Sequence, residues 1–347
     1  MSSKRLFVLL ALALAVTGGA FWLSSQRTLK RDPDYGTPVL PGLAAGLDAV
    51  TSLKVVGAGG QALVTLARRD GRWQVAEAGY PADPARVRRL LVALGELHVL
   101  EPKTDDPARY AALGVEDVED PKAGSLRLEL GGLRDPVALL VGHAAGQGAY
   151  VRVPGQRQAL EARPGLDVAR SPRDWLARTV VDLAPARVQA VDVERSDSPA
   201  WRAAKNARDA PHFDVAGLPK GRELASLGAA DPAGNALGNL EFDDVRRAAP
   251  ATGHGPAERA VFRCFDGLVV TLEGRSDGEA RWVTLTASYD EALATRFPPA
   301  AGQAAPGAEQ VRVEADRIAG TARGWEYRIP PYRFDAIFRK RDELLRR

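Results

Sequence analysis

The chain has an apolar N-terminal segment, followed by a longer body in which apolar and polar residues are mixed. An uncharged, mostly apolar run from Leu6 to Leu23 follows the cations Lys4 and Arg5. At about 1.5 Å rise per residue, a helix of this length crosses most of the roughly 30 Å hydrocarbon core of a bilayer. Flanking cations favour the cytoplasmic side of the membrane. The pattern therefore predicts a cytoplasmic N-terminus (residues 1–5), a transmembrane helix (residues 6–23) and a body outside the cytoplasm.

Two other interpretations of this run stay open. A cleaved signal peptide has an apolar core of about 7 to 15 residues ending at small residues, and Gly18 and Ala20 resemble such an end. A buried core helix is the other alternative. A lipoprotein signal is excluded because no cysteine follows the run. We expect a single-pass protein of the inner membrane with its body on the periplasmic side.

The residues that follow the apolar run change in composition. Residues 24–46 are rich in proline and glycine and carry Arg27, Lys30 and Arg31. Such a composition is typical of extended linkers, and its cations favour the lipid headgroups. We therefore expect residues 24–46 to form a stalk between the membrane and the body.

The body begins with alternating apolar and polar residues, which predict antiparallel strands at 50–56, 62–68 and 72–76. Asp70-Gly71 predicts a tight two-residue turn between the last two of these strands. After Pro84, apolar residues recur at helical spacing, which predicts a helix with one face packed on the sheet.

Three further strands are predicted at 126–130, 137–141 and 149–153. The glycine-rich residues 142–148 between the last two are expected to form a flexible hairpin loop. Near the C-terminus, the apolar residues from Phe334 to Leu345 predict a basic helix packed on the rest of the body. Docking of that helix on a partner or a membrane surface is the alternative.

The second half of the chain repeats spacings found in the first half. Three anchors recur in one order: Val50, Leu53 and Val55 with Val188, Val191 and Val193; residues 93–99 with 236–242; and Gly142 and Tyr150 with Gly274 and Trp282. An internal repeat of this kind indicates duplication. We expect an α+β fold of two duplicated units, residues 47–183 and 184–347, each a mainly antiparallel sheet with packed helices.

Composition limits the possible functions. The 347 residues carry 47 basic and 44 acidic side chains, and this near balance gives no global field that would indicate nucleic-acid binding. The single cysteine, Cys264, lies in an apolar run and has no partner for an intramolecular disulfide. A small buried hydrophobic residue is its simplest interpretation.

No catalytic or metal-binding pattern is evident. The four histidines are scattered without ligand spacing, and the acidic clusters at 105–106 and 116–120 lack the alternation of a calcium loop. Gly274-Arg275-Ser276-Asp277-Gly278 matches the nucleophile-elbow pattern, but it joins two predicted strands and is expected to be a hairpin turn. Five tryptophans spread along the body are expected to pack in or beside the core: Trp73, Trp175, Trp201, Trp282 and Trp325. We predict no catalytic residues, no metal site, no cofactor and no enzymatic activity.

Short segments of the chain occur in an order found in a known family. They are Leu40-Pro41-Gly42-Leu43, Gly71-Arg72-Trp73, Tyr80-Pro81-Ala82-Asp83, Tyr110 with Leu113-Gly114-Val115, Val141-Gly142 with Tyr150-Val151-Arg152, and Trp175-Leu176. In these segments the chain resembles the bacterial family called domain of unknown function 4340. The resemblance implies a single-pass envelope protein with an accessory or scaffold role, in some members linked to auxiliary subunits of gliding-type ABC transporters.

The sequence thus favours a membrane-anchored accessory protein that binds a partner in the envelope or in a transporter complex. Antiparallel sheets with exposed edges are natural docking surfaces for another chain. Two alternatives stay open: an envelope hydrolase with carboxylates or Ser276 in a cleft between the units, and a glycan- or lipid-binding module that uses the aromatic side chains.

Overall fold

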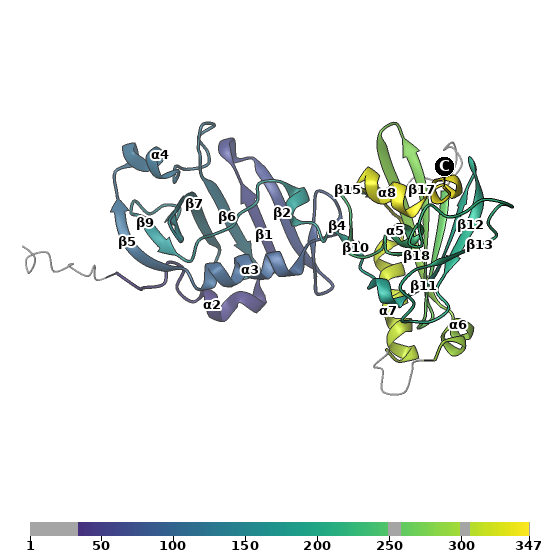
Figure 1. Ribbon diagram of the computed structural model, residues 1–347. Coiled ribbons are helices and arrows are strands. Elements are labelled where there is room, and N and C mark those ends of the chain that lie inside the picture. The colour runs from purple at the N-terminus through teal and green to yellow at the C-terminus, as the bar shows by residue number, and fades with distance from the viewer. Residues whose placement is uncertain (1–33, 249–257, 299–305, 347) are drawn as a thin grey trace, which may run out of the picture. The chain divides into compact units, whose positions relative to one another are not determined.

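The computed structural model describes residues 34–248, 258–298 and 306–346 (Figure 1). The predicted transmembrane helix at 6–23 and the start of the predicted stalk lie outside these residues. None of the helices in the described ranges combines the length and the apolar character that a membrane span requires.

The described residues form two compact units, and the chain enters the second unit twice. Residues up to Gly71 and Ala85–Ser171 form the first unit, whereas Arg72–Pro84 and the residues from Pro172 onward form the second. The predicted boundary after residue 183 did not anticipate the early excursion at 72–84.

The first unit is built on an antiparallel sheet with the strand order β2-β1-β6-β7-β8-β9-β5. Its strands are β1 (Ser52–Val56), β2 (Ala62–Arg69), β5 (His98–Thr104), β6 (Leu126–Gly131), β7 (Val137–Ala145), β8 (Gly148–Arg152) and β9 (Ala159–Arg163). Its helices are α2 (Leu43–Gly46), α3 (Pro84–Gly95) and α4 (Tyr110–Leu113), with 3₁₀ turns at Leu47–Ala49, Ala58–Gly60 and Pro107–Arg109.

Alternation along the strands forms the core of this unit. Leu53 on β1 is fully buried and lies opposite Leu66 on β2 and Leu130 on β6. The long helix α3 lies across the strands in Figure 1 and buries an apolar stripe made of Val87, Leu90, Leu91 and Leu94. The helix at this position confirms the prediction from helical spacing.

The second unit contains an eight-stranded antiparallel sheet among the described residues, with the order β13-β12-β11-β16-β17-β18-β19-β15. Its strands are β11 (Val188–Arg195), β12 (Ser198–Ala204), β13 (Asp214–Ala216), β15 (Asp244–Arg247), β16 (Glu258–Cys264), β17 (Leu268–Asp277), β18 (Ala280–Tyr289) and β19 (Trp325–Arg328). Short strands β3 (Arg72–Val75), β4 (Tyr80–Pro81), β10 (Thr179–Val181) and β14 (Leu240–Glu241) complete the strands. The helices are α5 (Asp231–Gly234), α6 (Glu291–Arg296), α7 (Ala308–Ala322) and α8 (Pro331–Ile337), with 3₁₀ turns at Pro172–Trp175, Pro185–Arg187 and Arg341–Leu344.

Helices cover one face of this second sheet. α7 packs on β17 and β18, α8 on β18 and α5 on β11, and Figure 1 shows the three helices along the same side of the strands. On the opposite face, paired positions such as Glu194, Arg259 and Glu273 are exposed. We call this opposite side, which the described residues leave uncovered, the open face.

The two sheets share one strand order. Seven strands of each sheet correspond, and if they are counted along the chain, both sheets read 2-1-4-5-6-7-3. Gly142 and Gly274 lie on the corresponding strands β7 and β17, and Tyr150 and Trp282 on β8 and β18. Such a shared order is what an internal repeat produces.

Three sequence-based expectations need correction. Residues 34–46 are not an extended stalk, because the Val39 amide donates to Leu97 O (2.8 Å) and Leu43 is buried. Residues 142–145 belong to β7, whose pairing with β8 shifts register between Val141 and Ala144, so only the turn at 146–147 is a loop. The predicted C-terminal helix is two pieces, because α8 ends at Ile337 and a separate 3₁₀ turn follows; its apolar residues are nevertheless buried, as expected.

Candidate functional site

The histidines do not form a metal centre. His98 and His143 belong to the first unit, whereas His212 belongs to the second and bonds through Nδ1 to Asp231 Oδ2 at 2.7 Å. His254 lies outside the described residues. Among the residues that the structure does describe, no group of three or more His, Cys, Asp or Glu side chains is arranged to hold a metal ion.

Ser276 is not part of a nucleophile elbow. It pairs with Arg281 in the ladder between β17 and β18, and the turn of that hairpin lies beyond it at Gly278, which has a positive φ of 58°. The predicted hairpin is therefore confirmed.

Cys264 is fully buried at the end of β16. Burial raises the pKa of its thiol to about 12, with the nearby Asp266 carboxylate acting in the same direction. A thiol held in its neutral form is a poor nucleophile. The interpretation of Cys264 as a small hydrophobic core residue is confirmed.

The acidic clusters and the tryptophans have structural roles. Asp106 and Asp120 accept hydrogen bonds from the backbone amides of Ala108 and Lys122, which is how short acidic side chains stabilise turns. Four tryptophans are buried: Trp175, Trp201, Trp282 and Trp325. They have little surface to offer to a ligand.

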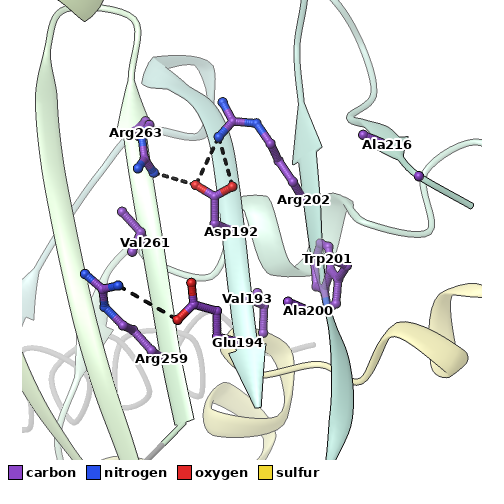
Figure 2. Close-up of a pocket in the computed structure, with 11 residues that line it drawn as sticks. Asp192, Val193, Glu194, Ala200, Trp201, Arg202, Ala216, Arg259, Val261 and Arg263 are labelled. Atoms are coloured by element: carbon purple, nitrogen blue, oxygen red, sulfur yellow. Dashed lines mark hydrogen bonds and ion pairs between the residues drawn. The ribbon is translucent and has the colours of Figure 1, made fainter. Parts of the chain in front are cut away.

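The open face of the second unit holds a polar site, a cavity of about 530 Å³ over β11, β12 and β16. Figure 2 shows Asp192 on β11 at its centre, between Arg202 on β12 and Arg263 on β16. The ladder positions these side chains, because Asp192 lies directly opposite Arg202 on one side and Val261 on the other. Small residues, Ala200 and Ala216, form part of the rim.

Asp192 is held by both arginines. Nη1 of Arg202 donates to its two carboxylate oxygens at 2.9 and 3.1 Å, and Nη1 of Arg263 donates to Oδ2. A second, looser pair joins Arg259 to Glu194 at 3.8 Å along the same face (Figure 2). These side chains are partly exposed, and such ion pairs contribute roughly 0–1 kcal/mol each to folding. The cluster is therefore not required to hold the sheet together.

The arginines of this cluster retain unused hydrogen-bonding capacity. A guanidinium has five N–H donors. Within the described parts of the chain, only Nη1 of Arg202 and of Arg263 has a hydrogen-bond partner, so Nε and Nη2 of both are free. Two positive charges also face one carboxylate. The arrangement can accept a further anionic group, and arginine forks suit carboxylate and phosphate oxygens especially well.

Sequence reasoning missed this site because β16, which supplies Arg263, is far along the chain from the consecutive strands β11 and β12. One local signal was present: Asp192 and Glu194 on β11, and Arg259 and Arg263 on β16, occupy alternate positions and so point to one face. The pairing of β11 with β16, which brings these opposite charges together, was not available from that pattern.

Segments that carried the family resemblance meet in the structure. In the first unit, Arg152 is buried, donates to Val115 O and Asp117, and stacks 4.3 Å from the Tyr110 ring centre. In the second unit, residues 82 and 176 form a β-bridge, and the Tyr80 ring packs edge-on against three aromatic rings, those of Phe242, Trp325 and Tyr327.

Comparison with protein families gives a match over residues 73–258, more than half of the chain, to the family described as Domain of unknown function (DUF4340). The chain belongs to this family. The match begins in the early excursion into the second unit, spans most of the first and includes the Asp192–Arg202 pair, but ends before Arg263. Comparisons with curated proteins and with solved structures gave no match.

Proposed function

We propose that this DUF4340 protein is an interaction protein that docks a partner protein on the open face of its second unit. The observation that carries the proposal is the Arg202–Asp192–Arg263 cluster, which lies in a cavity and has free guanidinium donors. Arginine is enriched at the centres of protein interfaces, where its donors pair with groups of the partner. The cluster therefore supplies specific contacts on a surface that folding does not need.

The compartment is part of the same proposal. The apolar run at 6–23 with preceding cations supports a single-pass anchor in the inner membrane and a body on the periplasmic side. The partner is then a protein of the envelope, and a component of an ABC transporter complex is the candidate that the family resemblance favours. In this arrangement the anchor limits the search for a partner to the membrane surface.

The other two functions have weaker support. The hydrolase hypothesis relied on carboxylates or on Ser276, and Ser276 lies in a strand ladder. The pair His212–Asp231 has the geometry of a base oriented by a carboxylate, but the contacts of the described residues connect no nucleophile to it. The glycan or lipid hypothesis relied on the aromatic side chains, and four of the tryptophans among them are buried.

Site-specific photo-crosslinking in living cells tests the proposal. A photoreactive residue replaces Ala216, which is exposed on the rim of the cavity, and a matched control replaces Val313, which is exposed on α7. We expect an adduct of defined mass from position 216 alone. The charge reversal Arg202→Glu with Arg263→Glu should abolish it, because the free donors are lost and repulsion replaces attraction.

Two results would contradict the docking proposal. One is the same adducts from positions 216 and 313, which would indicate collision without recognition. The other is an adduct from position 216 that persists in the charge-reversed protein, which would separate the contact from the arginine cluster. Circular dichroism of the purified variants checks that both are folded.

A further inference from the structure

The cavity of the open face reaches the edge of the second sheet. β13 is the edge strand, paired on one side with β12 through Arg202 opposite Ala216, residues 203 and 215, and residues 204 and 214. In the described chain, no backbone hydrogen bond joins residues 214–216 to anything but β12. An edge of this kind presents unpaired N–H and C=O groups that can pair with another strand.

The residues between this edge and the arginine cluster are small. Ala216 and Gly217 on the β13 side and Ala200 on β12 line the cavity together with Arg202. Strands lie about 4.8 Å apart in a sheet, so a strand added beyond β13 would run roughly 10 Å from β12. The short side chain of Ala216 lies between the added strand and Arg202. Across it, the side chain of a glutamate on the added strand and that of Arg202 are together long enough to meet.

Charge also defines where an acidic residue fits along the edge. At the Ala216 end, Arg202 lies directly opposite Ala216 and keeps free Nε and Nη2 donors. At the other end, Asp214 places a carboxylate on the same face, bonded to Asn206 at 3.2 Å. An acidic residue is thus attracted opposite Ala216 and repelled opposite Asp214, which would set the register of an added strand.

We infer that the partner segment is an extended, carboxylate-bearing strand that pairs with the free edge of β13 and places an acidic side chain on Arg202, whose Nε and Nη2 are free. This inference rests on the proposed docking function and specifies the partner's chemistry. Main-chain hydrogen bonds supply affinity in this mode of recognition, and the arginine pocket supplies selectivity.

The test uses the full chain in detergent and a blocked, fluorescein-labelled heptapeptide of threonine with a single glutamate at its centre. Fluorescence anisotropy measures the dissociation constant. A peptide with glutamine in place of glutamate removes the charge, and a glutamate peptide with alternate N-methylated amides removes the donors for strand pairing. We expect each change to weaken binding about tenfold or more, because charged hydrogen bonds and main-chain pairing each contribute.

Protein variants provide the matched comparison. Arg202→Gln should weaken binding of the glutamate peptide about tenfold or more and leave binding of the glutamine peptide unchanged. Arg317→Gln makes the same charge change on an exposed residue of α7, and binding should stay within about twofold of the wild type because only distant screened charge is lost.

The outcomes separate this inference from the docking proposal. Equal binding of the N-methylated peptide would overturn strand addition, and unchanged binding to the Gln variant would overturn the arginine contact. Absence of measurable binding by the glutamate peptide would also overturn the inference. In each case the crosslinking experiment at position 216 tests the docking proposal independently, because it makes no assumption about the partner's conformation.

Discussion

Arg152 is the single charged side chain on which the fold of residues 110–118 depends most clearly. Its three nitrogen atoms donate to Val115 O (2.9 Å), Gln156 O (3.1 Å) and Asp117 (2.8 Å), and only 3% of the side chain is exposed. Arg152→Met keeps an unbranched apolar stem but removes the guanidinium and leaves two carbonyl groups without a donor. We expect the free energy of unfolding to fall by about 3 kcal/mol, measured by urea denaturation.

A matched control for this substitution is Arg109→Met. Arg109 is 76% exposed and approaches Asp106 only at 3.9 Å, so its loss should change the free energy of unfolding by less than about 0.5 kcal/mol. If both variants lost the same stability, burial and hydrogen bonding of Arg152 would not be the reason for its effect.

Cys264 gives a second prediction at the residue scale, one that depends on pH. The folded thiol has a pKa of about 12 against an ordinary value of 9.0, so between these pH values the unfolded chain loses a proton that the folded chain keeps. The free energy of unfolding should therefore decline as the pH rises from about 9 to 12, more steeply than in Cys264→Ala. Urea denaturation at several pH values measures the difference in slope.

The accessibility of the same thiol can be tested separately. A thiol reagent at pH 8 should label the folded protein very slowly and label one thiol per chain in urea, because the chain has a single cysteine and it is buried. Rapid labelling of the folded protein would show that β16 opens readily and would contradict the burial argument.

At the scale of elements, we predict that replacing two different glycines by alanine changes the stability in opposite directions. A Cβ atom on Gly142 in β7 would lie 2.2 Å from Leu113 O and 2.7 Å from Gly114 O, which are backbone atoms that cannot move aside easily. Gly142→Ala should therefore lower the free energy of unfolding by about 2 kcal/mol or more. A Cβ atom on Gly320 in α7 would meet nothing within 4 Å, so Gly320→Ala should raise stability by about 0.5–1 kcal/mol.

Thermal unfolding of the two alanine variants measures both signs in one experiment. Because the same methyl group is added in each case, a common effect on the unfolded chain largely cancels in the comparison. A stabilised Gly142→Ala variant would mean that the segment at 113–114 moves away from β7 without cost, and the close packing described for the first unit would then have no energetic role.

Most of the elements could be predicted from the sequence because local pattern determines them. The turn at Asp70-Gly71, with φ of 49° and 76°, has the positive values that such a two-residue turn requires. The extension of β7 through Gly142 was missed because a register shift interrupts the alternation there. The break after Ile337 was missed because apolar spacing continues across it, while the chain bends so that Leu345 can bridge to Leu224.

At the scale of the whole molecule, two copies of one strand order support different surfaces. In the first unit, residues 110–118 pack against β7 and β8 through contacts such as Arg152 with Val115. In the second unit, no described segment covers the open face, and the Asp192 cluster lies there exposed. Alternation of apolar and polar residues predicts both sheets but does not reveal which face of a sheet stays uncovered. Which face is covered depends on the connections between the strands, and these differ in length between the two units. The candidate site was therefore beyond the reach of sequence pattern.

The expectation of an envelope partner requires that the body be held at a membrane, and the apolar run makes this testable. Arginine at the centre of a membrane helix costs about 2.5–3.5 kcal/mol, so Leu12→Arg with Leu14→Arg should release the full chain from washed membranes, whereas Thr28→Arg, outside the run, should not. Sedimentation followed by immunoblotting measures the membrane-bound fraction, and protease added to spheroplasts reports the side on which the body lies. A signal peptide would instead give a shorter, soluble periplasmic product from the wild-type gene. Full-length wild-type protein in the soluble fraction would contradict the anchor and remove the restriction that makes an envelope partner the expected one.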